Sequence, residues 1–175
     1  MNYKIMITGA AGSGTSSLGK ALSGILNIKH FEADDYLWIK TSPPFKIKRE
    51  FNSKISLAYN NLIKETDFIL SGSVESWGIK ISELFNLVIY LDIKKDIRIE
   101  RIRKRDVTKY GKVNEDFISW AAQYDTGELA GRSKERHIKW LKNLKCKILY
   151  FNNDTIKNYL EIILKELNIK QHSLS

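Results

Sequence analysis

The feature that most constrains this chain is a glycine-rich segment close to its amino terminus. A short apolar run, Ile5-Met6-Ile7, leads into Gly9-Ala10-Ala11-Gly12-Ser13-Gly14-Thr15-Ser16-Ser17. An amphipathic stretch follows, whose apolar residues recur at helical spacing: Leu18, Leu22, Ile25 and Leu26. A strand, a glycine-rich turn and a helix in this order begin a β-α unit. We therefore expect a parallel sheet built around this unit.

Short apolar runs alternate with longer amphipathic stretches along the rest of the chain. Strands are expected over residues 3–8, 28–32, 68–70, 87–91 and 147–151, and helices over 13–27, 51–65, 95–105 and 155–167. This order predicts an α/β fold, a doubly wound parallel sheet with helices on both faces, in a single domain over residues 1–175. The polar segment 107–132 is predicted to be a helical lid, with a helix around 115–124.

The glycine-rich segment matches a phosphate-binding pattern, the P-loop, at all positions but one. The pattern places two glycines five positions apart, then lysine, then serine or threonine. Gly9, Gly14 and Ser16 match, but Thr15 occupies the lysine position. Glycines allow successive N–H groups to point at phosphate oxygens, and the start of the helix attracts anions. We predict that a nucleoside triphosphate binds on Gly9, Ala10, Ala11, Gly12, Ser13, Gly14, Thr15, Ser16 and Ser17, with the Ser16 hydroxyl on magnesium.

The lysine-free loop is similar to that of a known kinase family. Gly-Ser-Gly-Thr-Ser-Ser, residues 12–17, resembles the Gly-Ser-Gly-Thr-Thr-Thr loop of archaeal-type cytidylate kinases. The order of elements resembles the adenylate kinase-like superfamily of nucleoside-monophosphate and shikimate kinases. This resemblance implies the strand order 2-3-1-4-5, ATP and Mg²⁺ as cofactors, and phosphate transfer to a nucleoside monophosphate or a hydroxylated metabolite. It also implies that lid arginines supply the charge that Thr15 lacks.

Two carboxylates, Asp34 and Asp35, follow the second expected strand. In the shikimate and gluconate kinase branch, an aspartate in this region lies near the acceptor hydroxyl and magnesium. The resemblance therefore implies that Asp35 orients or deprotonates the acceptor and binds magnesium, with Asp34 as second candidate. The third strand ends in Ser71-Gly72-Ser73 without a carboxylate, which favours the Asp34-Asp35 pair. Alternatively, Asp34 caps the following short helix.

The wall of the acceptor site is expected to come from polar and aromatic residues after the second and third strands. The candidates are Trp38, Phe45, Arg49 and Ser73, and Arg49 suits an anionic acceptor. The alternative is ordinary packing of a loop over the sheet. His30 and His137 have no partners at metal-ligand spacing, so both are interpreted as structural or solvent-facing.

Arginines downstream are candidates for clamping the transferred phosphate. Arg98, Arg101 and Arg105 fall on one helical face, and Arg132 is the last residue of the predicted lid. In kinases that resemble this chain, lid arginines hold that phosphate, a role that suits the planar guanidinium. This implies Arg101, Arg105 and Arg132. The alternative is a solvated helix face paired with Asp96, Glu100 and Asp106.

Composition narrows the partners and leaves two further functions open. The single cysteine, Cys146, excludes an intramolecular disulfide, and no apolar run reaches the ~20 residues of a membrane span, so we expect a cytoplasmic protein. A net charge of +9 favours anionic partners. Thr15 and Ser71 favour a nucleotide-binding protein without transfer activity. Residues 94–112 form a basic track suited to nucleic acid, although Tyr110 alone offers base stacking there.

Overall fold

One parallel sheet organises the computed structural model, which describes residues 2–42, 44–127, 132–152 and 156–169. Its strands are β1 (Lys4–Gly9), β2 (Lys29–Glu32), β3 (Phe68–Gly72), β4 (Leu87–Leu91) and β5 (Lys147–Phe151). The strand order is β2-β3-β1-β4-β5, which confirms the predicted order 2-3-1-4-5. β1 is central, and Ile7 pairs with Ser71 of β3 and Ile89 of β4.

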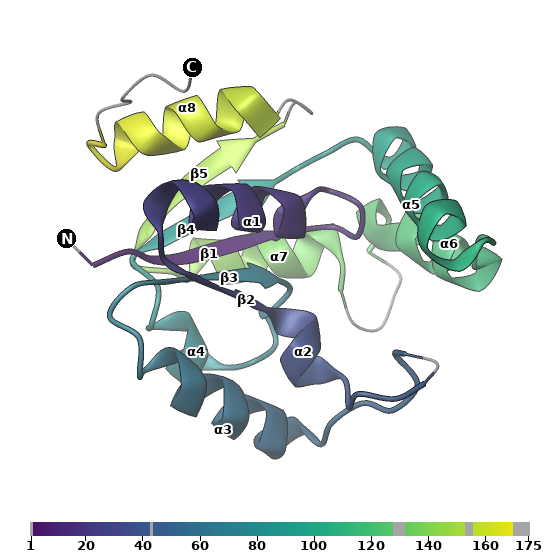
Figure 1. Cartoon of the computed structure of the whole chain (residues 1–175), viewed down its shortest axis with the longest axis horizontal. Helices are drawn as coiled ribbons and strands as arrows, with labels where there is room; N and C mark the ends of the chain where they lie inside the picture. The colour runs from purple at the N-terminus through teal and green to yellow at the C-terminus, as the bar shows by residue number, and fades with distance from the viewer. Residues whose placement is uncertain (1, 43, 128–131, 153–155, 170–175) are drawn as a thin grey trace.

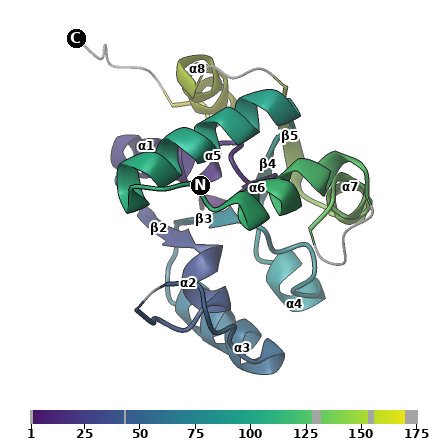
Figure 2. The ribbon, with the colours of Figure 1, turned by 90° about the vertical axis from the view of Figure 1, so that its right-hand side faces the viewer.

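Helices cover both faces of the sheet (Figure 1). α1 (Thr15–Leu26) and α8 (Ile156–Glu166) pack on one face, while α3 (Phe51–Leu62), α4 (Ile79–Ser82) and α7 (Lys134–Lys142) pack on the other. α2 (Ala33–Leu37) follows β2 directly. α5 (Lys95–Tyr110), α6 (Glu115–Ala122) and the 3-10 helix η1 (Gln123–Asp125) lie beyond the carboxyl ends of the strands (Figures 1 and 2).

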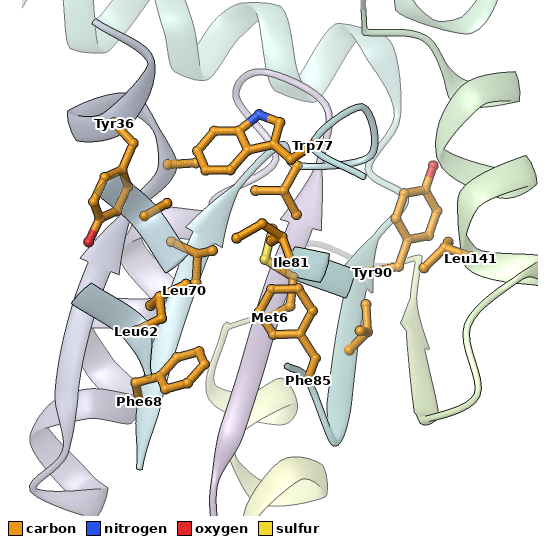
Figure 3. Packing of buried hydrophobic residues seen from close by; sticks show 14 residues of the cluster. Met6, Tyr36, Leu62, Phe68, Leu70, Trp77, Ile81, Phe85, Tyr90 and Leu141 are labelled. Carbon is orange, nitrogen blue, oxygen red and sulfur yellow. The ribbon is translucent and has the colours of Figure 1, made fainter. Parts of the chain in front are cut away.

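The alternation of side chains along each strand produces two separate cores. Ile5 and Ile7 of β1 face α1 and α8, whereas Met6 faces α3 and α4, and all three are fully buried. Figure 3 shows the Met6 side, where strand residues meet helix residues such as Leu62, Ile81 and Leu141. The inner strands β1, β3 and β4 are buried on both faces over most of their length, as central parallel strands are. Their polar residues Thr8 and Ser71 lie near the strand ends.

The observed elements differ from the predicted ones mainly around the lid. α5 continues to Tyr110, where Gly111 with a φ of 71° ends it, so the predicted lid begins inside a helix. The predicted helix over 115–124 is present as α6 and η1. α7 was not predicted, because His137 and Leu141 are its only fully buried side chains and its sequence is otherwise mostly polar. Part of the predicted lid, 128–131, lies outside the described residues, and its closure stays a prediction.

Among the residues described here, no helix combines the length and the apolar character that a membrane span requires.

We predict that Ile89→Ala lowers the free energy of unfolding by about 2–5 kcal/mol, because Ile89 is fully buried in the central strand β4 and its truncation leaves a cavity. The control is Ile79→Ala, since the Ile79 side chain is 69% exposed. Its expected cost is about 0.5 kcal/mol or less. Urea denaturation measures both values. Equal losses in the two variants would contradict the assigned burial.

Candidate nucleotide and acceptor site

The glycine-rich loop between β1 and α1 has a backbone that depends on glycine. Gly12 and Gly14 have φ values of 80° and 96°, in the left-handed region that residues with a Cβ rarely adopt. A Cβ on Gly9 would lie 2.6 Å from the carbonyl oxygen of Leu91 on β4. Gly14 is the N-cap of α1, and no described side chain caps this helix end. The first N–H groups of α1 are therefore available to an anion, as predicted for residues 9–17.

Arg101 of α5 lies beside the loop in which the P-loop lysine is missing. Its Nη1 donates to the carbonyl oxygen of Ser13 at 3.4 Å and lies 3.9 Å from where a Cβ of Gly14 would be. Thr15 itself is partly buried and carries no charge. A permanently charged guanidinium is thus held beside a loop that has no cation of its own.

The Ser16 hydroxyl contacts a carboxylate that the sequence analysis missed. Ser16 Oγ donates to Oε2 of Glu32 at 2.6 Å, and Glu32 is the last residue of β2. Hydroxyl and carboxylate oxygens are ligands that Mg²⁺ prefers, and this ion commonly takes one or two side chains beside phosphate oxygens and water. Ser16 and Glu32 therefore fit a magnesium ion. The sequence feature that could have identified Glu32 is its position at the end of a predicted strand, at the same sheet edge as the loop.

Asp34 and Asp35 occupy the first turn of α2 in different electrostatic surroundings. Solvent reaches Asp34, yet the protein around it removes part of its hydration, and this desolvation raises the pKa of its carboxyl group. Arg132 and Arg105 act in the opposite direction, so both lie within electrostatic reach of Asp34. Like desolvation, the charge of Asp35 acts to raise the pKa of Asp34, and it acts in the same direction on those of His30 and Tyr36. The N-cap of α2 is Glu32, so the alternative that Asp34 caps this helix is wrong.

Several cations of α5 are paired with local carboxylates. Arg103 contacts Glu115 of α6 at 2.6 Å, and Lys104 contacts Glu100 at 2.7 Å. Arg105 donates to the buried carboxylate of Asp106 and lies 5.7 Å from the ring centroid of Phe117. The predicted pairing with Glu100 and Asp106 is therefore present for part of this face. These ion pairs reduce the charge that the basic track offers to a nucleic acid.

The four predicted acceptor residues do not form one group. Trp38 and Phe45 pack edge to face at 6.0 Å on the loop after α2. Arg49 uses its Nε to donate to the carbonyl oxygen of Tyr36 at 3.1 Å. Ser73 lies at the end of β3, where its hydroxyl donates to Glu75 at 2.6 Å. No described contact joins Trp38, Phe45 or Arg49 to Ser73, so their common place in one acceptor site stays a prediction.

Lys54 of α3 is a buried residue, and no pattern in the sequence pointed to it. The residue is 8% exposed, and its Nζ lies 4.7 Å from the ring centroid of Phe51 and 5.5 Å from that of Trp77. None of the side chains that the structure describes forms a hydrogen bond or salt bridge with it. Desolvation lowers the pKa of its ammonium group, against the opposite effect of Glu75. Buried lysines normally have an anionic partner.

His137 of α7 joins β1, the segment after β3 and η1 through hydrogen bonds. Its Nε2 lies 3.0 Å from Oγ1 of Thr8 and 3.1 Å from Oγ of Ser73, and its Nδ1 lies 2.8 Å from the hydroxyl of Tyr124. The side chain is fully buried. Desolvation lowers the pKa of its imidazole to about 4, despite the nearby Glu75. His137 is therefore neutral and structural, one of the two predicted roles. His30, partly buried, bonds Ser71 at 2.8 Å.

The doubly wound sheet and its phosphate loop define a class, the P-loop proteins of the nucleoside-monophosphate and shikimate kinase type. The family described as AAA domain matches residues 5–118, and the chain belongs to this family. It is similar to Uncharacterized protein YqaC of Bacillus subtilis (strain 168), with 36% identity over 168 residues, 90% of this chain and 93% of the relative.

Two kinases are also similar in sequence. The shikimate kinase of Clostridium botulinum is 28% identical over 176 residues, 94% of this chain and 97% of the relative. The cytidylate kinase of Sulfolobus acidocaldarius is 33% identical over 114 residues, 59% of this chain and 62% of the relative. A gluconokinase from Sinorhizobium meliloti 1021 shares the fold, with a TM-score of 0.60 at 13% identity, covering 95% of this chain and 92% of that chain.

We predict that folding stability depends on pH through His137. The imidazole pKa is about 4 in the folded protein and 6.5 in the unfolded chain, so below pH 6.5 the unfolded state binds a proton that the folded state does not. Stability should fall between about pH 6.5 and 4, by roughly 3 kcal/mol. Urea denaturation at several pH values measures this slope. His137→Gln should flatten it in this range, and an unchanged slope in that variant would contradict the assignment.

Proposed function

We propose that this protein is an ATP-dependent phosphotransferase that moves the γ-phosphate to a small acceptor. The observation that carries the proposal is the Ser16–Glu32 contact beside the loop, with Asp34 and two arginines in electrostatic reach of one another. Phosphoryl transfer requires a loop that binds the nucleotide phosphates, oxygen ligands for the metal, a carboxylate for the acceptor and cations for the transferred phosphate. Similarity to a shikimate kinase and a cytidylate kinase supports the same reaction class.

The nucleotide side of the reaction follows from the loop and its neighbours. The N–H groups of the loop and of the first turn of α1 bind the phosphates of ATP. Ser16 and Glu32 hold Mg²⁺, which neutralises part of the phosphate charge when it is bound. In this proposal Glu32 replaces Asp35 as the carboxylate for the metal. Arg101 supplies the positive charge that a lysine at position 15 would otherwise provide.

The acceptor side is assigned to Asp34 rather than to Asp35. A carboxylate with a raised pKa near two arginines is suited to accept a hydrogen bond, and then a proton, from an acceptor hydroxyl. Arg105 and Arg132 stabilise the charge on the transferred phosphate. Closure of segment 107–132 would exclude water from the reaction. Ser73 and Glu75 are assigned to the acceptor side of the site. Trp38, Phe45 and Arg49 remain candidates for the outer wall of the acceptor site.

The acceptor is proposed to carry an anionic group that binds Lys54. The ammonium group of Lys54 is partly desolvated, and none of the described carboxylates forms a salt bridge with it, so a bound anion would offset part of its desolvation. Lys54 lies near Trp77, which follows β3, and Glu75 of the same segment influences its pKa. Both candidate classes of acceptor include anions, either a phosphate monoester or a carboxylate. The proposal excludes a neutral sugar or nucleoside.

A second function, nucleotide binding without transfer, is favoured by one specific observation. Thr15 leaves the loop without its usual cation. Arg101 offsets this loss only if it reaches the phosphates while it also bonds the Ser13 carbonyl oxygen. The assay below separates the two functions, because a binding protein retains ATP affinity but gives no acceptor-dependent ADP.

The principal test compares three carboxylate variants in an ADP-release assay with ATP, Mg²⁺ and pools of nucleoside monophosphates and hydroxy acids. Asp34→Asn should lower kcat by about 10²-fold or more, because the acceptor loses its general base. Glu32→Gln should raise the Mg²⁺ concentration needed for half-maximal rate, and Asp35→Asn should stay within about threefold of the wild type. ATP binding without ADP release in any pool would instead favour the binding protein.

We predict that Lys54→Met raises the KM for an anionic acceptor by about tenfold or more, since a charge-assisted hydrogen bond contributes about 1.5–3 kcal/mol. Its melting temperature should not fall, because methionine removes a buried charge and keeps the packing. Lys48→Met is the control, as Lys48 is exposed and lies 5.5 Å from the Trp38 ring centroid. Cytidylate paired with cytidine, and shikimate paired with its methyl ester, report charge preference. Equal turnover of charged and neutral members would refute the anion site.

A further inference from the structure

The guanidinium of Arg98 is fully buried at the junction of four backbone segments. Its Nε donates to the carbonyl oxygen of Ile93 at 2.9 Å, and its Nη1 to that of Ala121 at 3.2 Å. Its Nη2 forms an ion pair with Asp125 at 2.6 Å. Nη1 also lies 3.4 Å from the carbonyl oxygen of Ala11 in the phosphate loop. Because the five donors of a guanidinium have fixed directions, one side chain positions α5, α6, η1 and the loop relative to one another.

The contact with Ala11 determines the direction of a neighbouring N–H group. In a trans peptide the carbonyl and the following N–H point in opposite directions. When Arg98 holds the Ala11 carbonyl toward α5, the N–H of Gly12 must point away from α5. Arg101 holds the Ser13 carbonyl in the same manner, which directs the N–H of Gly14. The carbonyl groups of both peptides therefore contact arginines of α5, and the glycine that follows each of them has a positive φ.

A steric contact supports this arrangement independently of the hydrogen bonds. Both bonds are 3.4 Å long, so each is weak alone. However, a Cβ on Gly12 would lie 2.5 Å from the carbonyl oxygen of Arg98, so the loop backbone is in contact with α5 itself. The side chain of Ala11 also packs with the apolar cluster that contains Ile102 and Ile118 of α5 and α6. The carbonyl side of the loop is therefore covered by α5, which leaves its N–H side for phosphate.

We propose that Arg98 is a positioning residue for phosphate binding, which orients the Ala11–Gly12 peptide and ties that orientation to η1 through Asp125. Orientation matters more in this loop than in one with a lysine, because Thr15 carries no charge and the charge proposed to replace it belongs to Arg101, on the separate element α5. The ligand is the polyphosphate of a nucleotide, so this inference rests on the ATP binding proposed above. Arg98 itself does not touch the phosphates.

The test uses full-length protein and three variants. Arg98→Lys keeps the charge but loses the forked geometry, and Asp125→Asn removes the ion pair while Arg98 stays. Arg103→Met is the matched control, because Arg103 and Glu115 form an exposed ion pair between the same two helices, α5 and α6. Calorimetric titration with Mg²⁺-ATP gives Kd, and protein labelled with ¹⁵N-glycine reports the amide signals of Gly12 and Gly14. Thermal unfolding verifies that each variant is folded.

Arg98→Lys should raise the Kd for ATP by tenfold or more and shift the Gly12 amide signal in the absence of nucleotide. Asp125→Asn should shift the same signal and raise Kd by threefold or more. Arg103→Met should leave Kd within twofold and the signal in place. A structural role alone would lower the melting temperature without moving Kd in the folded variants.

Two results would overturn the proposal. One is a folded Arg98→Lys variant with wild-type Kd and an unmoved Gly12 signal, and the other is an equal effect of Arg103→Met. If Arg98→Lys does not fold, Asp125→Asn decides, and wild-type values in that variant reject the proposal. Failure of the proposed function gives a different pattern, in which the wild-type protein does not bind ATP although the Gly12 signal still responds to the variants.

Discussion

The arrangement of the site depends on how closely the backbone of the phosphate loop approaches β4 and α5. Gly9 lies against the Leu91 carbonyl and Gly12 against that of Arg98, at separations that admit no side chain. This contact fixes which side of the loop is open. It also brings α5 close enough for Arg98 and Arg101 to reach loop carbonyls. The positions of α6 and η1 follow, because both are bonded to the same Arg98 guanidinium.

Buried polar groups are concentrated at the carboxyl ends of the strands, where the apolar cores end. Arg98 and His137 are both fully buried, but they meet the cost of desolvation differently. Arg98 remains charged and is bonded to three carbonyl oxygens and one carboxylate. His137 remains neutral and bonds hydroxyl groups. The adjacent residues Tyr124 and Asp125 of η1 bond these two side chains, so η1 contacts both the loop side and the Ser73 side of the site.

The positive charges proposed to act on the phosphates come from several elements and not from the loop itself. Arg101 comes from α5, and Arg132 from the segment before α7. In the proposed site, the charge at the phosphates would depend on the relative positions of these elements. The proposal thereby reconciles a threonine at position 15 with phosphate binding. The same dependence would give the packing around Arg98 a larger role than it would have beside a lysine-containing loop.

Local pattern in the sequence determined the phosphate loop, and apolar runs determined all five strands, two of them, β4 and β5, with their observed bounds. These features are local, since they depend on glycine conformation and on the spacing of apolar residues. The strand order came from resemblance to a kinase superfamily. The tertiary structure alone decided three features of the site. These are the pairing of Ser16 with Glu32, the burial of Lys54 and Arg98, and the contact of His137 with Thr8. Thr8 and His137 are 129 positions apart, and a single sequence carries no local signal for such contacts. From the sequence alone, a charged or polar residue is predicted to face solvent. Only the packing of elements that are distant in the sequence shows that such a residue is buried.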